Sequence, residues 1–262
     1  MALVAWVLGP AAHFEASPVK MKEAAQLGRH VSESVSSGRT QQAYALLEPV
    51  LTARTRFPIL GRIGQQLGVQ PLGTVEAFLD RIAAGKTEGG WVVIGAALGV
   101  LLAHDLGGAL QRCRAFIIDA DVWYATDILG ERVPGPALLL DLSATLAASS
   151  PWREDPSRWV RRAVGVAVHF WAKRSGGDAA LEPEATALLA FLEPLFSEWD
   201  MDAVKGLGWG LKTLGRYYPA LVTAWLTEQV VVRQRRHRAP MVRKALTYLP
   251  DEPLVHALRD AM

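Results

Sequence analysis

The sequence has only one cysteine, Cys113, among its 262 residues. A single cysteine excludes an internal disulfide framework and any zinc site built from several cysteines. The lack of disulfides favours a reducing compartment, and we therefore expect a cytoplasmic protein. Arg112 and Arg114 flank the thiol and would lower its pKa. Because no paired histidine accompanies it, we interpret Cys113 as a structural residue.

The sequence also lacks an apolar run long enough to cross a membrane, which takes about 18 residues. The best candidate, residues 91–103, is interrupted by glycine and ends at His104 and Asp105. The apolar start, residues 1–10, has no preceding lysine or arginine. A buried helix or strand is therefore a better interpretation of this start than a secretory signal. We expect a soluble protein with no membrane partner.

Several common catalytic motifs are missing. The sequence contains no H-E-x-x-H metal motif, no G-x-x-x-x-G-K-[ST] phosphate loop and no G-x-S-x-G nucleophile elbow. Its six histidines are scattered. His169 lies in an otherwise apolar segment, where a hydrogen-bonded core histidine is a simpler interpretation than a ligand. We expect no metal site.

A strong excess of charge is absent too. The chain has 28 Lys and Arg against 26 Asp and Glu, which gives a net charge of +2. Proteins that bind nucleic acid mainly through its phosphates usually carry a larger positive charge. A nucleic-acid partner would therefore require the basic residues to be concentrated on one surface.

The sequence is rich in helical periodicity. Segments of about 10 to 18 residues place apolar side chains three and four positions apart, and proline, glycine or paired serines separate these segments. Because no strand pattern accompanies them, the sequence predicts an all-α fold in which short loops join many antiparallel helices. The expected helices are residues 18–35, 40–52, 57–67, 73–84, 89–103, 107–118, 121–129, 135–148, 156–173, 183–197, 201–215, 219–229 and 240–248.

A short pattern recurs in the second half of the chain. Its copies, 43 and then 39 residues apart, are Arg162-Ala-Val-Gly-Val-Ala, Lys205-Gly-Leu-Gly-Trp-Gly and Lys244-Ala-Leu-Thr-Tyr-Leu. These offsets are close to those of HEAT and armadillo repeats, which stack into a solenoid with a concave face of equivalent helices. Each copy opens with a basic residue, and its small residues would allow close packing on a neighbour. Chance similarity between amphipathic helices is the alternative.

Basic residues gather late in the sequence, whereas acidic residues dominate the segment before them. The late residues are Lys205, Lys212, Arg216, Arg233, Arg235, Arg236, His237, Arg238, Arg243 and Lys244. An isolated charge run is usually a solvated loop. Because this run adjoins the basic starts of repeated helices, a phosphate-binding surface is an equally good interpretation.

Three clusters combine a tryptophan with a charged side chain. They are Trp123-Tyr-Ala-Thr-Asp127, Trp159-Val-Arg161-Arg162 and Gly208-Trp209-Gly-Leu-Lys212. Residues three or four positions apart share one face of a helix, so each ring and its charge would point the same way. Taken singly, each cluster is more simply a core tryptophan with a charge outside. Together they supply aromatic faces, one carboxylate and cations, which suit a cationic planar ligand beside an anionic backbone.

The order W-x-x-x-D, then W-x-x-R, then G-W-x-L-[RK] with a Tyr-Pro turn resembles the DNA alkylation repair glycosylases, which are built from HEAT-like repeats. The similar region runs from about Arg56 to Pro250 and is most recognisable over residues 204–219 and 239–246. We expect a single HEAT-like repeat domain over residues 1–262. Within it, residues 51–250 resemble the family's repeats, and residues 1–50 are N-terminal helices that match poorly.

The resemblance implies a monofunctional glycosylase that excises cationic N3- or N7-alkylated purines from duplex DNA, without flipping the base and without metal or nucleotide cofactor. Trp123 and Trp209 would contact the deoxyribose and the cationic lesion. Asp127 would stabilise positive charge on the sugar and position the attacking water. Arg162 would bind a nearby phosphate. Because the leaving base is already cationic, no strong general acid is required.

The remaining basic residues would hold the duplex along a concave face. They are Lys212, Arg161, Lys205, Arg235, Arg236, Arg238, Arg243 and Lys244. Lys212 departs from the family pattern, where arginine is common, and lysine lacks the bidentate fork of a guanidinium. Residues 175–184 form a longer connection than the family usually has. No nucleophilic lysine is evident near Asp127, so we expect no strand-cleaving step.

Two other functions remain open at this stage. Some relatives have lost the glycosylase site, so the chain could be a non-catalytic DNA-binding protein that recognises unusual or damaged DNA. It could also be a protein-interaction scaffold, although a scaffold has no reason to direct its C-terminal basic residues inward. An enzyme needs Asp127 to face the same groove as Trp123, Trp209 and Arg162. We expect a monomer, as is common for repeat proteins of this size.

Overall fold

The computed structural model describes residues 19–250 and 253–260. Within these ranges the chain is helical and has no β-strand, which confirms the expected all-α fold. The apolar start at residues 1–10 and the first residue of the expected helix 18–35 lie outside the described residues. Among the residues described, no helix is long and apolar enough to cross a membrane.

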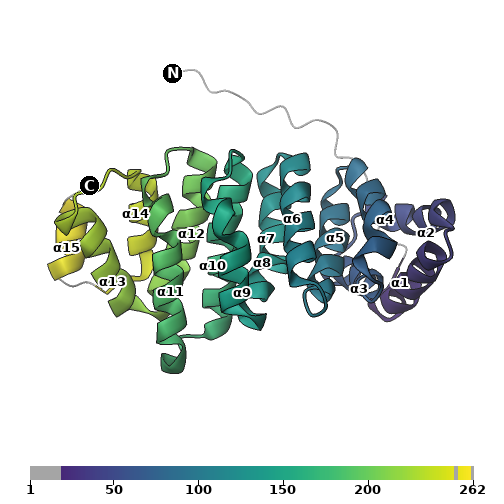
Figure 1. Ribbon diagram of the computed structural model, residues 1–262, viewed down its shortest axis with the longest axis horizontal. Coiled ribbons are helices and arrows are strands. Elements are labelled where there is room, and N and C mark those ends of the chain that lie inside the picture. Colours follow the sequence, from purple (N-terminus) through teal and green to yellow (C-terminus); the bar gives the residue numbers. More distant parts are fainter. Residues whose placement is uncertain (1–18, 251–252, 261–262) are drawn as a thin grey trace, which may run out of the picture.

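One layer of helices runs the length of the molecule, and each helix in it packs on the next (Figure 1). The most extensive of these contacts joins α10 and α12. The helices of this layer are α1 (Met21–Ser36), α3 (Phe57–Leu67), α5 (Glu88–Leu101), α7 (Trp123–Arg132), α10 (Arg158–Ser175), α12 (Met201–Tyr217) and α14 (Ala239–Ala245).

The other helices form a second layer against the first. They are α2 (Thr40–Thr52), α4 (Leu72–Ala84), α6 (Leu106–Ala120), α8 (Pro134–Leu140), α9 (Leu142–Ser149), α11 (Glu182–Leu192), α13 (Pro219–Thr227) and α15 (Pro253–Asp260). Short turns of helix extend several elements, namely η1 (Ser150–Glu154), η2 (Ala179–Leu181), η3 (Glu193–Ser197), η4 (Glu228–Val232) and η5 (Leu246–Tyr248). Buried residues from Ala24 to Leu258 form one hydrophobic cluster between the layers.

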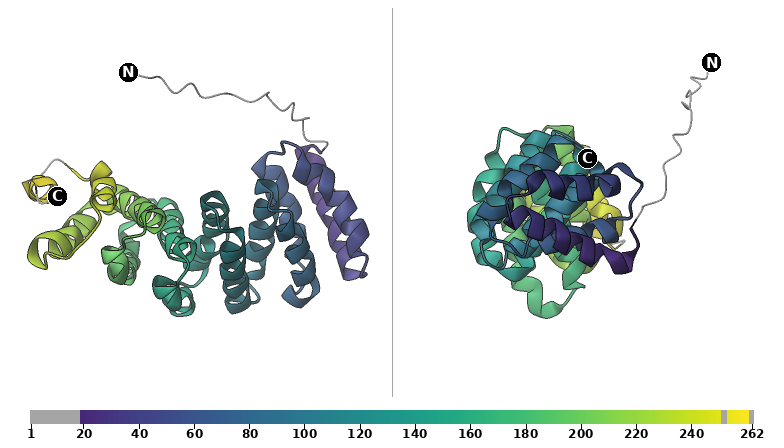
Figure 2. Two further views of the ribbon diagram at one scale, coloured as in Figure 1. Left: turned by 90° about the horizontal axis from the view of Figure 1, so that it is seen from above. Right: turned by 90° about the vertical axis from the view of Figure 1, so that its right-hand side faces the viewer.

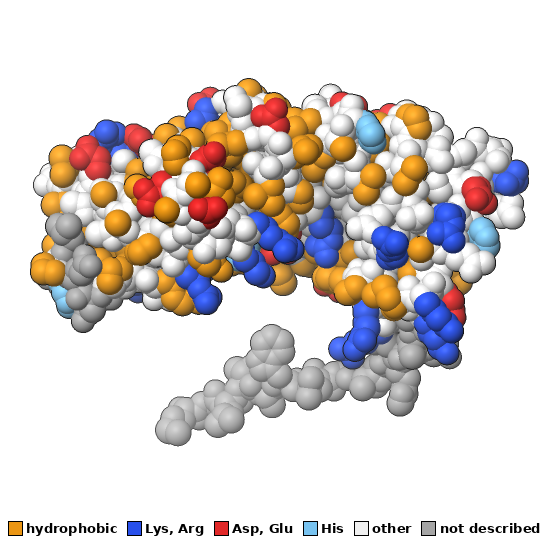
Figure 3. Space-filling model, turned by 90° about the horizontal axis from the view of Figure 1, so that it is seen from below, with side chains coloured by type: hydrophobic (Ala, Val, Ile, Leu, Met, Phe, Trp, Pro, Cys, Tyr) orange, Lys and Arg blue, Asp and Glu red, His pale blue; other side chains and the backbone are white. Residues whose placement is uncertain are grey.

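The row of helices is bent along its length. Seen from above, the N-terminal and C-terminal ends of the row lie nearer the upper edge of the picture than its middle does, so one side of the molecule is hollowed (Figure 2, left). In that view, α9 and α11 lie on the outer side of the bend. The space-filling view shows lysine and arginine side chains spread along the hollowed margin (Figure 3).

Glycines set the close approach of helices in the first layer. A Cβ atom on Gly165 of α10 would lie 2.3 Å from the carbonyl oxygen of Gly206 on α12. A Cβ atom on Gly210 would lie 2.6 Å from the carbonyl oxygen of Gly165. Both distances are shorter than real Cβ contacts, so only glycine permits this spacing. The small residues expected to allow close packing therefore do so at the α10–α12 contact.

Helix positions agree with the expected segments, with two exceptions. The expected helix 135–148 is divided at Asp141, whose backbone is extended and whose carboxylate accepts a hydrogen bond from the Ala144 amide at 2.9 Å. This N-cap begins a new helix, α9, at the next residue. The C-terminal helix α15 was not expected. The longer connection at residues 175–184 contains Gly176 and Gly177, both with positive φ, and the short helix η2.

Candidate functional site

Helix α7 carries three candidate site side chains on one stripe. Trp123, Asp127 and Glu131 are spaced four residues apart, so their side chains lie along one face of the helix. Trp123 is 57% exposed, an unusual position for so large an apolar side chain. Burial raises the pKa of the Glu131 carboxyl, and the nearby charge of Asp127 acts in the same direction. The stripe thus combines an accessible indole with two neighbouring carboxyl groups.

Arg162 of α10 forms a bidentate ion pair with Asp127. Its Nε donates to Asp127 Oδ1 at 2.7 Å, and its Nη2 donates to Oδ2 at 2.8 Å. The third nitrogen, Nη1, donates to the carbonyl oxygen of Asp202 at 3.0 Å, at the start of α12. Only 7% of Arg162 is exposed, and 18% of the Asp127 side chain. The structure therefore brings these two predicted residues together, with the arginine bound to the carboxylate itself.

Trp209 of α12 is half-buried and stacks on His169 of α10. The two ring centroids are 3.9 Å apart, and the ring planes are inclined by 25°. His169 Nδ1 lies 2.7 Å from the hydroxyl of Thr213, one turn after Trp209. Its Nε2 lies 3.7 Å from the Glu131 carboxylate, on the α7 stripe. The interpretation of His169 as a hydrogen-bonded, buried histidine is confirmed, and its contacts link Trp209 to Glu131.

Lysines border this cluster on the C-terminal side. Lys244 of α14 donates to the carbonyl oxygen of Lys205 at 3.3 Å. Burial lowers the pKa of the Lys244 ammonium, the positive charges of Arg162 and Lys212 lower it further, and Asp127 acts in the opposite direction. Lys244 is thus close enough to Asp127 for their charges to interact. The sequence did not indicate this proximity of Lys244, and the expectation that no strand-cleaving step occurs stays a prediction.

We call the surface formed by these side chains the site face. It is defined by residues of α7, α10, α12 and α14, which contact or electrostatically influence one another across the helices, together with Trp123, which shares the α7 stripe with Asp127. They are Trp123, Asp127, Glu131, Arg162, His169, Lys205, Trp209, Lys212 and Lys244. The three basic residues that open the recurring sequence pattern, Arg162, Lys205 and Lys244, lie on successive helices of the first layer.

Arg161, by contrast, is directed away from Asp127. Its Nε donates to Glu198 Oε2 at 2.5 Å, and its Nη1 donates to the carbonyl oxygen of Asp155 at 2.5 Å. Neighbouring positions on a helix do not share a face, so Arg161 and Arg162 diverge. Arg161 thus joins η1 and the turn before α12. Trp159 is also a core residue, and its indole donates to Asp121 Oδ1 at 2.5 Å.

The basic run before α14 is divided between paired and exposed residues. Arg235 donates to Gln229 Oε1 at 2.9 Å and lies 5.6 Å from the Phe196 ring centroid. Arg238 lies 5.0 Å from the ring centroid of Trp199. Arg236 and Arg243 are exposed. Lys212 lies 4.9 Å from the ring of Tyr248, an aromatic neighbour that the sequence analysis did not identify.

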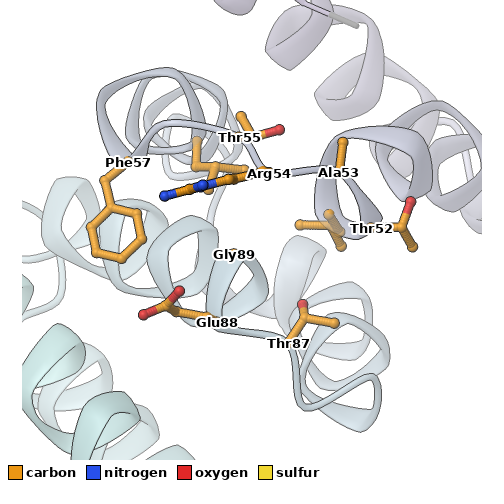
Figure 4. A pocket seen from close by; sticks show the side chains of 10 residues that line it. Thr52, Ala53, Arg54, Thr55, Phe57, Thr87, Glu88 and Gly89 are labelled. Carbon is orange, nitrogen blue, oxygen red and sulfur yellow. The ribbon is translucent and has the colours of Figure 1, made fainter. Parts of the chain in front are cut away.

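Two other features lie apart from the site face. A pocket of about 570 Å³ opens between the end of α2, the start of α3 and the start of α5, with Arg54, Phe57 and Glu88 around it (Figure 4). None of its lining residues belongs to the site face. Cys113 is fully buried in α6, and burial raises the pKa of its thiol, in agreement with a structural role.

Glu131 is a residue of the site face that could not be singled out from the sequence. It also lines a second pocket, of about 450 Å³, formed by α3, α5, α7, α8 and α10. Its position four residues after Asp127 was available from the sequence, but only the contact with His169 distinguishes it from a solvated surface carboxylate. The same holds for Thr213, four residues after Trp209.

These features describe an all-helical protein whose stacked helices bring an Asp–Arg pair, two indoles and several lysines onto one face. The sequence model of the DNA alkylation repair enzyme family matches residues 95–249. The chain therefore belongs to the DNA alkylation repair enzyme family. The matched residues include α7, α10, α12 and α14, which carry the site face, and exclude α1 to α4. No curated protein and no solved structure matches the chain.

Proposed function

We propose that this chain is a monofunctional DNA glycosylase that hydrolyses the N-glycosidic bond of cationic N3- or N7-alkylated purines in duplex DNA. The observation that carries the proposal is the bidentate Asp127–Arg162 pair, with Trp123 one turn earlier on α7 and Trp209 on α12, the helix that Arg162 also contacts. Family membership supports a role in the repair of alkylated DNA.

The chemistry of such a bond favours a fixed carboxylate. Cleavage leaves positive charge on the deoxyribose, and an ionised side chain held in place beside it lowers the energy of that transition state. Arg162 holds Asp127 through two hydrogen bonds and is itself fixed by the Asp202 carbonyl, so the carboxylate is already held in place before DNA binds. The alkylated base leaves without protonation because it is already cationic.

The indoles supply attraction for the substrate. An aromatic face attracts a cation, most strongly where water is excluded. Trp123 is exposed one helical turn before Asp127, and half-buried Trp209 is linked through His169 to Glu131, one turn after Asp127. We propose that these rings contact the deoxyribose and the alkylated base while the base stays stacked in the duplex.

We propose that the helix layers form a HEAT-like solenoid whose hollowed side binds the DNA backbone. Lysine and arginine side chains gather on that side (Figure 3), and Lys205, Lys212 and Lys244 border the Asp127 cluster. Phosphate contacts of this kind would position the duplex without reading its sequence. Exposed Arg236 and Arg243 are proposed as further contacts, and paired Arg161, Arg235 and Arg238 as contacts that require rearrangement.

A non-catalytic DNA-binding protein is the second candidate, and one observation favours it. Both oxygens of Asp127 are occupied by Arg162, as they would be in a purely structural ion pair. A glycosylase must offer this carboxylate to the sugar, so Arg162 would have to exchange at least one of its bonds for a phosphate oxygen when DNA binds.

Base release from duplex DNA tests the choice. Purified protein would be incubated with a duplex containing N7-methylguanine or N3-methyladenine, and free base would be measured for the wild type and for Asp127→Asn. We expect release by the wild type and a loss of at least about a hundredfold in the variant, the effect of removing one strong electrostatic group. No release by the wild type, together with salt-sensitive binding to the same duplex, would favour the non-catalytic candidate.

Asp155→Asn is the matched control. Asp155 is a buried carboxylate paired with Arg114 at 2.5 Å, and it lies on the turn before α10, away from the site face. Its replacement breaks a comparable ion pair without touching the proposed reacting group. We expect both variants to lose stability, measured by urea unfolding, and only Asp127→Asn to lose base release.

A further inference from the structure

His169 is the one buried histidine in contact with both the α7 stripe and Trp209 within the described chain. Its ring covers one face of the indole at a centroid distance of 3.9 Å. The exposed part of the Trp209 indole is therefore the part that His169 does not cover. A stacked ring fixes its neighbour without a directional bond, and aromatic pairs of this kind contribute about 0.5–1.5 kcal/mol beyond area burial.

Hydrogen bonding fixes the tautomer of His169. The Thr213 hydroxyl donates to the carbonyl oxygen of Trp209 at 3.0 Å, so its oxygen accepts from His169 at 2.7 Å. The donor must then be Nδ1–H, which leaves the lone pair of Nε2 directed towards Glu131. Thr213, which follows Trp209 on α12, holds one edge of the ring, and the Glu131 carboxyl of α7 faces the other edge at 3.7 Å, beyond hydrogen-bond distance.

The charges around the imidazole favour its neutral form. Burial lowers the pKa of His169 to about 4, and Lys173 on the same helix and Lys244 on α14 lower it in the same sense. Glu131 is the carboxylate that faces Nε2 from α7, and burial raises its own pKa. At neutral pH the imidazole behind Trp209 is therefore uncharged.

We propose that His169 is a positioning residue: it holds the indole of Trp209 from behind, with Thr213 fixing the imidazole and Glu131 facing its other edge, so that the rest of the indole is presented to the cationic base. This inference rests on the proposed glycosylase function. A neutral ring behind the indole leaves the negative π-face available to the substrate cation. An imidazolium in the same place would compete for that face and repel the cation.

Replacement of His169 separates stacking from charge. His169→Ala removes the ring, and we expect it to lower the single-turnover rate of N7-methylguanine release about ten- to a hundredfold, as expected for a misplaced contact group. His169→Phe restores an uncharged ring and should recover most of that loss. His104→Ala, at an exposed histidine in the turn before α6, is the control and should leave the rate unchanged.

The pH profile gives a readout that a merely structural residue would not change. Lys173→Gln removes one of the charges that keep the His169 pKa low, so this pKa should rise in an NMR titration of the imidazole. The pH at which the release rate falls on the acid side of its profile (the acid limb) should rise by the same amount. In Lys173→Gln combined with His169→Phe, this limb should disappear.

The outcomes separate the inference from the function it rests on. Wild-type release together with an unchanged rate in His169→Ala overturns the positioning role and leaves the glycosylase proposal standing. Failure of His169→Phe to restore the rate, or an acid limb that ignores Lys173→Gln, also overturns it. Absence of release by the wild type overturns the proposed function and with it any catalytic role of His169. In that case the indole ¹H–¹⁵N signal of Trp209 still tests the stacking. If His169 stacks on Trp209, this signal must shift as His169 titrates.

Discussion

Arg162 is held by three hydrogen bonds, two to the carboxylate of Asp127 and one to the carbonyl of Asp202. Replacement of Arg162 by alanine would leave a carboxylate that is mostly buried without its cation. We expect Arg162→Ala to lower the free energy of unfolding by about 3–5 kcal/mol, the cost of breaking one side of a buried ion pair. Urea unfolding monitored by circular dichroism measures this loss.

The double variant identifies its cause. Asp127→Ala removes the stranded carboxylate, so Arg162→Ala combined with Asp127→Ala should be more stable than Arg162→Ala alone. Additive losses in the two single variants would show that the pair contributes through packing of the arginine stem and not through its charge.

The neutral His169 makes stability depend on pH. Its folded pKa of about 4 lies below its unfolded value of 6.5. The unfolded chain therefore binds the proton first, and the contribution is present above pH 6.5 and is lost as the pH falls towards 4. We expect a decline on the order of 2–3 kcal/mol across this window. Glu131→Gln removes the facing carboxylate. In that background, the protein with His169→Phe should lack the decline that the protein with His169 shows. Equal slopes in the two proteins would contradict the lowered pKa.

Single residues also show where sequence reasoning ends. Trp123 and Asp127 could be placed on one face because four residues separate them on a helix, and Arg162 and Trp209 followed from their order in the chain. That Arg162 binds Asp127, or that His169 lies between Trp209 and Glu131, depends on the spacing and rotation of α7, α10 and α12. These quantities are set by packing between helices and leave no local sequence signal.

Among elements, the contact between α10 and α12 sets the geometry of the site. A Cβ atom on Gly206 would lie 2.6 Å from Cγ of Arg162, and one on Gly165 would lie 2.3 Å from the Gly206 carbonyl. Alanine at either position must push the helices apart. We expect Gly165→Ala to destabilise the protein by about 1–3 kcal/mol and to weaken base release, because Arg162 moves relative to Asp127. Thermal unfolding and single-turnover release measure the two effects.

Gly61 provides the matched control within the same layer. It lies inside α3, and a Cβ atom there would meet nothing within 4 Å. Gly61→Ala should therefore stabilise the protein by up to about 1 kcal/mol through helix propensity, without changing base release. A loss of stability at Gly61 equal to that at Gly165 would mean that helix spacing is not the cause.

The helices themselves were largely predictable. Apolar periodicity and the turn residues between segments located most of them, since both signals are local. The division of residues 135–148 at Asp141 was missed because the N-cap interrupts an otherwise continuous apolar pattern. The glycines of α10 and α12 were recognised as small contact residues, although only the packed helices identify Gly165 and Gly206 as a direct contact.

For the whole molecule, the proposed DNA face depends on basic residues from several helices, so its affinity should fall steeply with salt. Neutralising one phosphate contact reduces the slope of log K against log salt concentration by about one. We expect Lys205→Gln, Lys212→Gln and Arg243→Gln each to cause this reduction in duplex binding measured by fluorescence anisotropy, and the combined variant to add their effects.

Arg233→Gln is the control because Arg233 belongs to the same basic run but is paired with Glu193 at 2.6 Å and with Glu228 at 2.8 Å. These carboxylates already neutralise its charge, so its replacement should leave the slope unchanged. This result would show that only individual basic residues contact phosphate and that the total charge of the run does not set the binding. If all four variants shift the slope equally, binding follows total charge, and the face defined by α7, α10, α12 and α14 does not orient the DNA.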